Sequence, residues 1–200
     1  MTWHEWRTRG DVPPRKGYHS ASLVGDRMVV FGGSDGHASF ADVHVLNLRE
    51  YFLPQWLAHE AETLTWTLVY TEVKHSRLSH TATQVGSYLF IIGGHNGQSY
   101  AQEVLLFNLV TLAWETKQVY GVAPPGRGYH VAILHDSRIF ISGGYNGSTV
   151  YNDLWVLDLA ASASLPQVVS CSPSFGLAVK LMNRRRSKLM RLLIIYVKLL

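Results

Sequence analysis

Cysteine is nearly absent from this chain of 200 residues, and that scarcity limits the class of protein it can belong to. The single Cys171 has no second cysteine with which to form a disulfide or a multi-cysteine metal cluster, so we expect a cytoplasmic protein. A secretory signal is not expected either, because the first residues, "MTWHEWRTRGDVPP", contain no apolar run. The apolar run "LLIIYV" near the C-terminus is far shorter than the roughly 20 residues that cross a bilayer.

Acidic residues are missing from the C-terminal end of the chain. Residues 160–200 carry 7 Lys/Arg and no Asp/Glu, whereas residues 1–159 carry 11 Lys/Arg and 14 Asp/Glu. The net charge of +4 therefore divides into +7 for this tail and −3 for the main body. Because nucleic-acid binding requires a clustered basic surface, no nucleic-acid partner is expected for the main body.

What the chain does have is one pattern written three times: an apolar strand, two glycines, a polar turn and a second apolar strand. The copies read "MVVFGGSDGHASFADVHVLNL" (28–48), "LFIIGGHNGQSYAQEVLLFNL" (89–109) and "IFISGGYNGSTVYNDLWVLDL" (139–159). In each copy a histidine precedes the first glycine by 13 residues, and an acid follows that glycine by ten. These residues are His19, His80 and His130; Gly32, Gly93 and Gly143; and Asp42, Glu103 and Asp153. Repeats about 50 residues long with short strands are typical of propeller blades.

Alternating apolar residues and glycine turns predict four short strands in each unit and no helix. The fourth strand contains a tryptophan, which is Trp66 in the first unit and Trp114 in the second. Together with "RLSH" and "RGYH" at the start of the units, the recurrent diglycine and the tryptophan resemble the kelch repeat. The predicted units are residues 17–70, 78–119 and 128–159, preceded by an isolated strand at 3–8.

The resemblance implies an all-β fold, namely an incomplete kelch-type β-propeller of about three four-stranded blades over residues 1–159. In such a fold neighbouring blades approach closely at the end of the second strand, so glycines leave room where a side chain would collide. This structural role is assigned to Gly32, Gly33, Gly93, Gly94, Gly143 and Gly144, with Trp66 and Trp114 as structural aromatic residues of the motif. Closed propellers have roughly four to eight blades, so three blades predict a truncated form of a longer propeller protein.

Residues 160–200 are not expected to form a blade, because they contain no glycine pair and no blade spacing. The favoured interpretation is a disordered or helical tail that an altered splice site or reading frame has joined to the repeats. The weaker alternative is a basic amphipathic helix over residues 178–200 that lies on an anionic membrane surface.

The histidines and acids of the repeat do not converge on one point, because symmetry spreads equivalent residues over different blades. We therefore expect His19, His80 and His130 to bond backbone groups inside their own blades, and the three acids to accept backbone N–H bonds. No catalytic residue, metal or cofactor is predicted. The alternative is an enzyme whose pocket lies in the propeller channel, because the resemblance to the kelch repeat also implies a relation to galactose-oxidase-like enzymes.

The predicted function is protein binding through loops that share one face of a propeller. The loops after the second strands supply the candidate contacts Ser34, Asp35, His37, His95, Asn96, Tyr145 and Asn146. The insertion "REYFLPQWLAHEAE" in the first unit supplies Tyr51, Phe52 and Trp56 as a second docking site. Arg15, Arg77 and Arg127 either meet acidic residues of a partner or bridge to a carboxylate of their own blade. The sequence thus predicts a non-catalytic scaffold or adaptor module with an unidentified protein partner.

Overall fold

The computed structural model describes residues 1–48 and 64–160, and residues Met1–Ala160 form one compact unit. The described residues contain twelve β-strands and no helix, so the prediction of an all-β fold is confirmed for this part of the chain. The strands are β1 (Thr8–Gly10), β2 (Ser20–Val24), β3 (Arg27–Phe31), β4 (Val43–Asn47), β5 (Leu64–Val69), β6 (Thr81–Val85), β7 (Tyr88–Ile92), β8 (Val104–Asn108), β9 (Ala113–Glu115), β10 (Val131–His135), β11 (Arg138–Ser142) and β12 (Leu154–Asp158).

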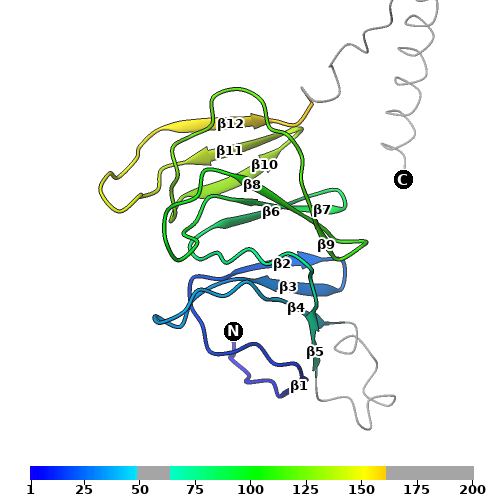
Figure 1. The fold of residues 1–200 in the computed structure, drawn as a ribbon. Helices are drawn as coiled ribbons and strands as arrows, with labels where there is room; N and C mark the ends of the chain where they lie inside the picture. Colours follow the sequence, from blue (N-terminus) through cyan, green and yellow to red (C-terminus); the bar gives the residue numbers. More distant parts are fainter. Residues whose placement is uncertain (49–63, 161–200) are drawn as a thin grey trace, which may run out of the picture. The chain divides into compact units, whose positions relative to one another are not determined.

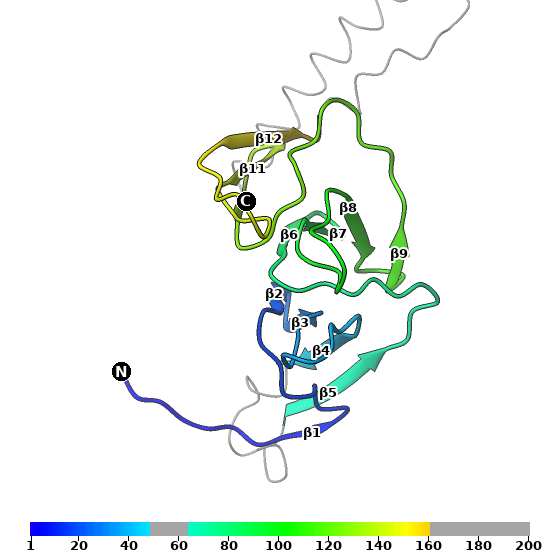
Figure 2. The ribbon, with the colours of Figure 1, turned by 60° about the vertical axis from the view of Figure 1, so that its left-hand side comes forward.

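These strands form three sheets, one for each repeat (Figure 1). The first sheet has the order β1-β5-β4-β3-β2, the second β6-β7-β8-β9 and the third β10-β11-β12. Within each repeat all neighbouring strands are antiparallel, and the second sheet lies between the first and the third (Figure 2).

The N-terminal strand differs from its prediction. Instead of an isolated strand at 3–8, β1 covers Thr8–Gly10 and pairs in parallel with the outer edge of β5. The chain then turns away at Gly10, whose φ is +80°, and the backbone N–H of Asp11 donates to the carbonyl oxygen of Trp66 at 3.0 Å. Each residue of β1 pairs with a residue 56 positions later in the chain, which local alternation does not reveal.

Apolar side chains from the first and second sheets form one core. Val29, Phe31 and Val43 of the first sheet pack with buried leucine, isoleucine and phenylalanine residues of β7 and β8. Trp114 of β9 fills the space between them, because its ring lies 5.0 Å from Phe31 and 5.0 Å from Phe107. Trp66 lies in a separate cluster on the other face of the first sheet, with Val30, Leu46 and Leu64.

A second core joins the second and third sheets. Ile139 and Ile141 of β11 are almost fully buried against Ile92 of β7, and Trp155 and Leu157 of β12 pack beside them. The opposite face of the third sheet is apolar but open: Val131, Ile133, Leu154 and Val156 are 64%, 63%, 66% and 47% exposed.

Candidate interaction face

The glycine pairs lie where the backbone of one sheet meets the chain that begins the next. The N–H of Gly33 donates to the carbonyl oxygen of Arg77 at 2.7 Å, and the N–H of Gly94 donates to that of Arg127 at 2.7 Å. A Cβ atom at Gly93 would lie 2.5 Å from the Arg127 oxygen, and one at Gly32 would collide with the Arg77 oxygen in the same way. At these two junctions the repeat therefore requires the absence of a side chain.

A basic side chain in each unit bridges to the acid that lies 26 positions later. The pairs are Lys16–Asp42 (2.8 Å), Arg77–Glu103, and Arg127–Asp153, which has two hydrogen bonds of 2.5 and 2.9 Å. Arg77 and Arg127 are each only 2% exposed, so they bridge to their own blade and do not meet a partner. In the first unit Lys16 makes the bridge, whereas Arg15 is exposed. Long basic side chains reach all three carboxylates, which the expectation of backbone N–H bonds did not include.

The Arg127 bridge is the most extensive of the three. Its guanidinium also donates to the carbonyl oxygens of Pro125 at 3.1 Å and Gly143 at 3.0 Å, and its Cζ lies 3.8 Å from the centre of the Tyr151 ring. Hydrogen bonds from Arg127 and from the Trp155 indole lower the pKa of Asp153 to about 2. The carboxylate is therefore charged at neutral pH.

Two of the three repeat histidines form hydrogen bonds between neighbouring sheets. His80 Nε2 forms a hydrogen bond with Ser20 Oγ at 2.8 Å, and His130 Nε2 forms one with Thr81 Oγ1 at 3.0 Å. Each hydroxyl belongs to the first strand of the preceding sheet, so the expectation of bonds to backbone groups within a blade is wrong for these two. Burial, reinforced by Arg77, lowers the pKa of His80 to about 3; burial and Arg127 lower that of His130 to about 4. Both imidazoles are neutral at physiological pH.

Two kinds of loop share one face of the unit. Short β-bridges join Gly17 to Ser34, Leu78 to His95 and Gly128 to Tyr145. Each bridge pairs the loop that leads into a first strand with the loop that follows a second strand. We call the surface formed by these loops, residues 15–19, 34–40, 77–80, 95–100, 125–130 and 145–150, the loop face.

Most of the predicted contact residues shape the loops as well as lining them. Oδ1 of Asp35, Asn96 and Asn146 each accepts two backbone N–H bonds, from the residues two and three positions later, at 2.7 to 3.0 Å. The bonds from Ala38 and His37 lower the pKa of Asp35 below its usual range. Ser34 Oγ and His95 Nδ1 accept the N–H of the glycine two positions on, and the Tyr145 hydroxyl donates to the Gly147 carbonyl. His37 is exposed.

Aromatic side chains form a row across the second and third repeats of the loop face. The His95 and Tyr100 rings lie 4.9 Å apart, and Tyr100 lies 6.3 Å from Tyr145, both in edge-to-face geometry. Beside this row is a shallow hollow of about 520 Å³, lined by His95, Gln98, Ser99, Tyr100, Pro125, Gly126, Asn146 and Gly147. Sequence reasoning did not select Tyr100, because the equivalent positions of the other two copies are Ser39 and Val150 and the repeat therefore does not mark this position as aromatic.

A second aromatic pair was also missed. Tyr18, Ser79 and Tyr129 directly precede the repeat histidines and share a left-handed backbone, with φ of 57°, 55° and 59°. The N–H of Ser79 donates to the Tyr18 carbonyl at 2.9 Å, and that of Tyr129 to the Ser79 carbonyl at 3.0 Å. The two tyrosine rings meet at 6.1 Å and 87° while remaining 58% and 54% exposed. The sequence shows a tyrosine directly before two of the three repeat histidines, but not the left-handed backbone that exposes these side chains.

Some predicted features lie outside the described residues. Tyr51, Phe52 and Trp56 fall in 49–63, and the tail falls in 161–200. Among residues 1–48 and 64–160, no three His, Cys, Asp or Glu side chains are grouped as metal ligands. A search of the same residues finds no helix long and apolar enough to cross a membrane.

Comparison with known proteins identifies the repeat. A family model described as the KLHDC2/KLHL20/DRC7 Kelch-repeats domain matches residues 55–178, and a model described as the Kelch motif matches residues 15–51. The chain belongs to the kelch-repeat family. The resemblance drawn from the diglycine, the tryptophan and the "RLSH" and "RGYH" sequences is thereby confirmed.

Named relatives share the kelch segment but are much longer. Kelch domain-containing protein 3 of Homo sapiens is 31% identical over 145 residues, which cover 64% of this chain and 35% of that protein. Acyl-CoA-binding domain-containing protein 5 of Arabidopsis thaliana is 29% identical over 163 residues (78% and 24%), and the dynein alpha chain of the flagellar outer arm of Chlamydomonas reinhardtii is 35% identical over 162 residues (78% and 3%). The chain thus spans about a third or less of the length of these relatives.

Proposed function

We propose that the chain is a non-catalytic protein-interaction module that binds a segment of a partner protein on the loop face. The observation that carries the proposal is the Tyr18–Tyr129 pair. More than half of each side chain is exposed, yet backbone hydrogen bonds and a left-handed backbone fix its position. Preorganised aromatic side chains with a polar tip lose little conformational freedom on binding, and such residues often dominate the energetics of interfaces.

The neighbouring groups extend the same surface. Tyr100 and Tyr145 present ring edges beside the 520 Å³ hollow, and Asn146 lines that hollow too. His37 adds an exposed imidazole on the first repeat, and Arg15 an exposed cation. The partner segment that suits this surface is an extended peptide with aromatic or proline side chains for the tyrosines and a carboxylate for Arg15.

The ionisable groups favour binding over catalysis. The repeat acids are held by Lys16, Arg77 and Arg127, and the pKa of Asp35 is lowered rather than raised. A general acid at neutral pH requires a carboxyl group with a raised pKa. Two relatives support the same proposal, because the matched segment is a small part of an acyl-CoA-binding domain-containing protein and of a dynein alpha chain, whose names describe unrelated roles.

Serine occurs naturally at this position in the second repeat, so it is a suitable replacement for the two tyrosines. Ser79 holds the position of Tyr18 and Tyr129 with nearly the same φ, so Tyr18→Ser and Tyr129→Ser should leave the backbone unchanged. Peptides selected from a random display library on the immobilised chain should lose affinity about tenfold or more for each variant, measured by isothermal titration calorimetry. His135→Ser, an exposed change in the β10–β11 hairpin away from the loop face, is the control. Selected peptides that bind both tyrosine variants as tightly as the parent would refute the proposed site.

A further inference from the structure

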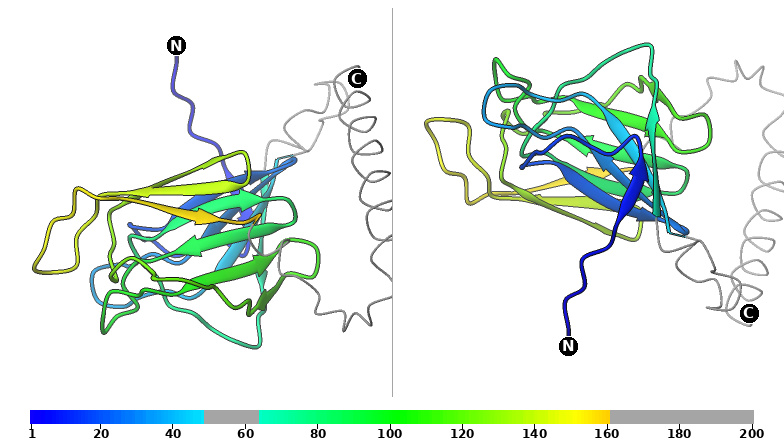
Figure 3. Two further views of the ribbon diagram at one scale, coloured as in Figure 1. Left: turned by 90° about the horizontal axis from the view of Figure 1, so that it is seen from above. Right: turned by 90° about the horizontal axis from the view of Figure 1, so that it is seen from below.

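The loop that follows the second strand of each repeat contains an acid or an amide directly before a glycine. The three pairs are Asp35-Gly36, Asn96-Gly97 and Asn146-Gly147. The loops that carry them lie at the same end of the unit (Figures 1 and 3). Asparagine is chemically labile, and a following glycine adds no side chain that would shield the backbone nitrogen from the asparagine side chain. The second and third repeats therefore each contain a candidate site of chemical modification.

The turn of the second repeat holds the side chain of Asn96 in a fixed position. Its Oδ1 accepts the backbone N–H groups of Gln98 and Ser99 at 2.9 and 2.8 Å, and its own N–H donates to the Ser99 carbonyl oxygen at 3.1 Å. Two N–H donors on a carbonyl oxygen stabilise the negative charge that an attack on the carbonyl carbon places there. Gly97 is exposed, so water reaches the turn.

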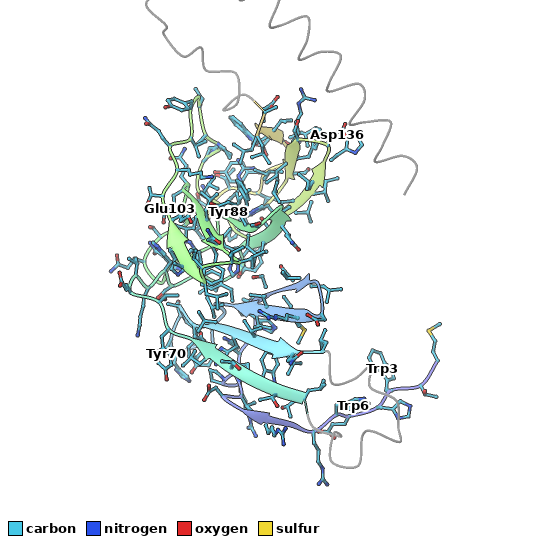
Figure 4. The ribbon with its side chains drawn as sticks, turned by 90° about the vertical axis from the view of Figure 1, so that its right-hand side faces the viewer. Trp3, Trp6, Tyr70, Tyr88, Glu103 and Asp136 are labelled. Carbon is cyan, nitrogen blue, oxygen red and sulfur yellow. The ribbon has the colours of Figure 1, made fainter. Side chains whose placement is uncertain are left out.

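The imidazole of His95 is bonded to the nitrogen that would make this attack. The N–H of Gly97 donates to Nδ1 of His95 at 3.1 Å, which places the imidazole where it can take the proton that the nitrogen loses. The ring is held edge-to-face against Tyr100 at 4.9 Å. The nearest carboxylate along the chain belongs to Glu103, which is labelled beside the second sheet in Figure 4 and is paired with Arg77. Glu103 is therefore not the base for this turn.

The third repeat has the same amide and glycine but a different residue before them. The hydroxyl of Tyr145 donates to the carbonyl oxygen of Gly147 and does not accept its N–H. Nδ2 of Asn146 donates to the Tyr151 hydroxyl at 2.7 Å. In the described part of the chain no histidine accepts the Gly147 N–H, so Asn146 is a reference site with the same turn and without the base.

The first repeat shows which substitutions the turn tolerates. Ser34 Oγ accepts the N–H of Gly36 at 3.0 Å, so a serine before the pair keeps the bond to the glycine nitrogen. Oδ1 of Asp35 accepts two backbone N–H groups at 2.9 and 2.8 Å, the same distances as at Asn96. A carboxylate at this position therefore keeps the turn intact.

We propose that Asn96 is a self-catalysed deamidation site, with His95 as its general base. His95 takes the proton of the Gly97 N–H while this nitrogen forms a bond to Cγ of Asn96. The Cγ–Nδ2 bond then breaks, and Nδ2 takes that proton and leaves as ammonia. Water opens the resulting cyclic imide at either carbonyl and yields aspartate or isoaspartate. One water is consumed and one ammonia released, with no oxidant or reductant.

The product alters the loop face without a partner or an enzyme. Aspartate at position 96 adds a negative charge directly beside His95 in the aromatic row and keeps the turn, as Asp35 does. Isoaspartate lengthens the main chain before Gly97 by one methylene group, so the turn cannot keep the same bonds. The modification is measured on the chain itself and does not depend on the proposed binding function.

Peptide mapping by mass spectrometry of the full chain, stored at neutral pH, tests the proposal. Conversion at Asn96 should be about tenfold or more faster than at Asn146, because a positioned base contributes at least that much. The chain unfolded in guanidinium chloride is the reference, since both sites are then exposed and should convert at nearly equal rates. A native ratio of the two rates no larger than the unfolded ratio would overturn the proposal.

A serine substitution separates the action of the base from the geometry of the turn. His95→Ser should keep a bond to the Gly97 N–H, as Ser34 does in its own repeat, but it removes the base. Conversion at Asn96 should slow about tenfold or more, while Asn146 converts as in the parent chain and serves as the internal control. Far-UV circular dichroism should not change. An unchanged rate at Asn96 would show that His95 is not the base.

The reciprocal substitution gives the third repeat the residue that the second one has. Tyr145→His places an imidazole two positions before Gly147, and conversion at Asn146 should become faster while that at Asn96 stays as in the parent. Electron-transfer fragmentation distinguishes isoaspartate from aspartate in both peptides. Because this variant gains a rate, its result cannot be explained by a loss of folding.

Discussion

Alanine at Gly93 places a methyl group between two sheets, whereas alanine at Gly143 does not. Both glycines have a left-handed backbone, with φ of +62° and +69°. A Cβ at Gly93 would lie 2.5 Å from the carbonyl oxygen of Arg127 and 2.8 Å from Cε1 of His130, both in the third repeat. At Gly143 the nearest atom, the Tyr151 carbonyl oxygen, lies at 3.5 Å, an ordinary contact distance.

Both substitutions therefore place an L-residue in a left-handed backbone, but only Gly93→Ala also creates a steric clash. The left-handed backbone costs an L-residue about 1–2 kcal/mol, and this applies to both positions. Gly93→Ala must in addition displace a carbonyl that accepts a 2.7 Å bond from Gly94, and overpacking of this kind costs about 1–3 kcal/mol more. We expect Gly143→Ala to lower the free energy of unfolding by about 1–2 kcal/mol and Gly93→Ala by about 2–5 kcal/mol.

Urea denaturation followed by tryptophan fluorescence measures this difference, provided that the slope with denaturant is unchanged between variants. Gly32→Ala is a replicate, because its Cβ would collide with the Arg77 carbonyl at the preceding junction. Equal losses of stability for Gly93→Ala and Gly143→Ala would show that the left-handed backbone alone accounts for the diglycine. The argument from clearance between blades would then be wrong.

Two further predictions concern the buried charges and histidines. Arg127→Ala leaves the carbonyl oxygens of Pro125 and Gly143 without this donor, so it should lower the free energy of unfolding by about 2–4 kcal/mol. The control Arg138→Ala breaks an exposed ion pair with Asp158 and should lower it by less than about 1 kcal/mol in the same denaturation assay. Acidification from pH 7 to 4.5 should lower the melting temperature, because the unfolded chain protonates its histidines near pH 6.5 while folded His80 and His130 stay neutral until about pH 3 and 4. The contribution of these two histidines to stability is thus complete above about pH 6.5 and is lost as the pH decreases. His80→Gln should reduce the dependence of the melting temperature on pH. An unchanged dependence would contradict the conclusion that folded His80 stays neutral in this range.

Local patterns in the sequence predicted most strands, because apolar residues recur along them and a glycine directly follows β2, β3, β6, β7 and β11. The repeat spacing also marked Arg127 and Asp153 as important, but spacing identifies equivalent positions and not their contacts. The His130–Thr81 bond shows the limit: the hydroxyl lies 49 positions earlier, in another sheet, and only the packing of the sheets brings it near. Tyr18 was overlooked because its exposure depends on a left-handed backbone that an L-residue seldom adopts.

The segment that starts each repeat connects the loop face to the stability of the junction between sheets. In "RGYH" the Arg127 carbonyl accepts the Gly94 N–H, Gly128 bridges to Tyr145, Tyr129 lies on the loop face, and His130 bonds Thr81 of the preceding sheet. Four consecutive residues thus both connect the second sheet to the third and form part of the loop face. A peptide that binds Tyr129 selects the conformation in which this segment is docked, so it also opposes separation of the second and third sheets. Binding on the loop face should therefore raise the melting temperature of the parent chain, and more so than that of Tyr129→Ser at the same peptide concentration.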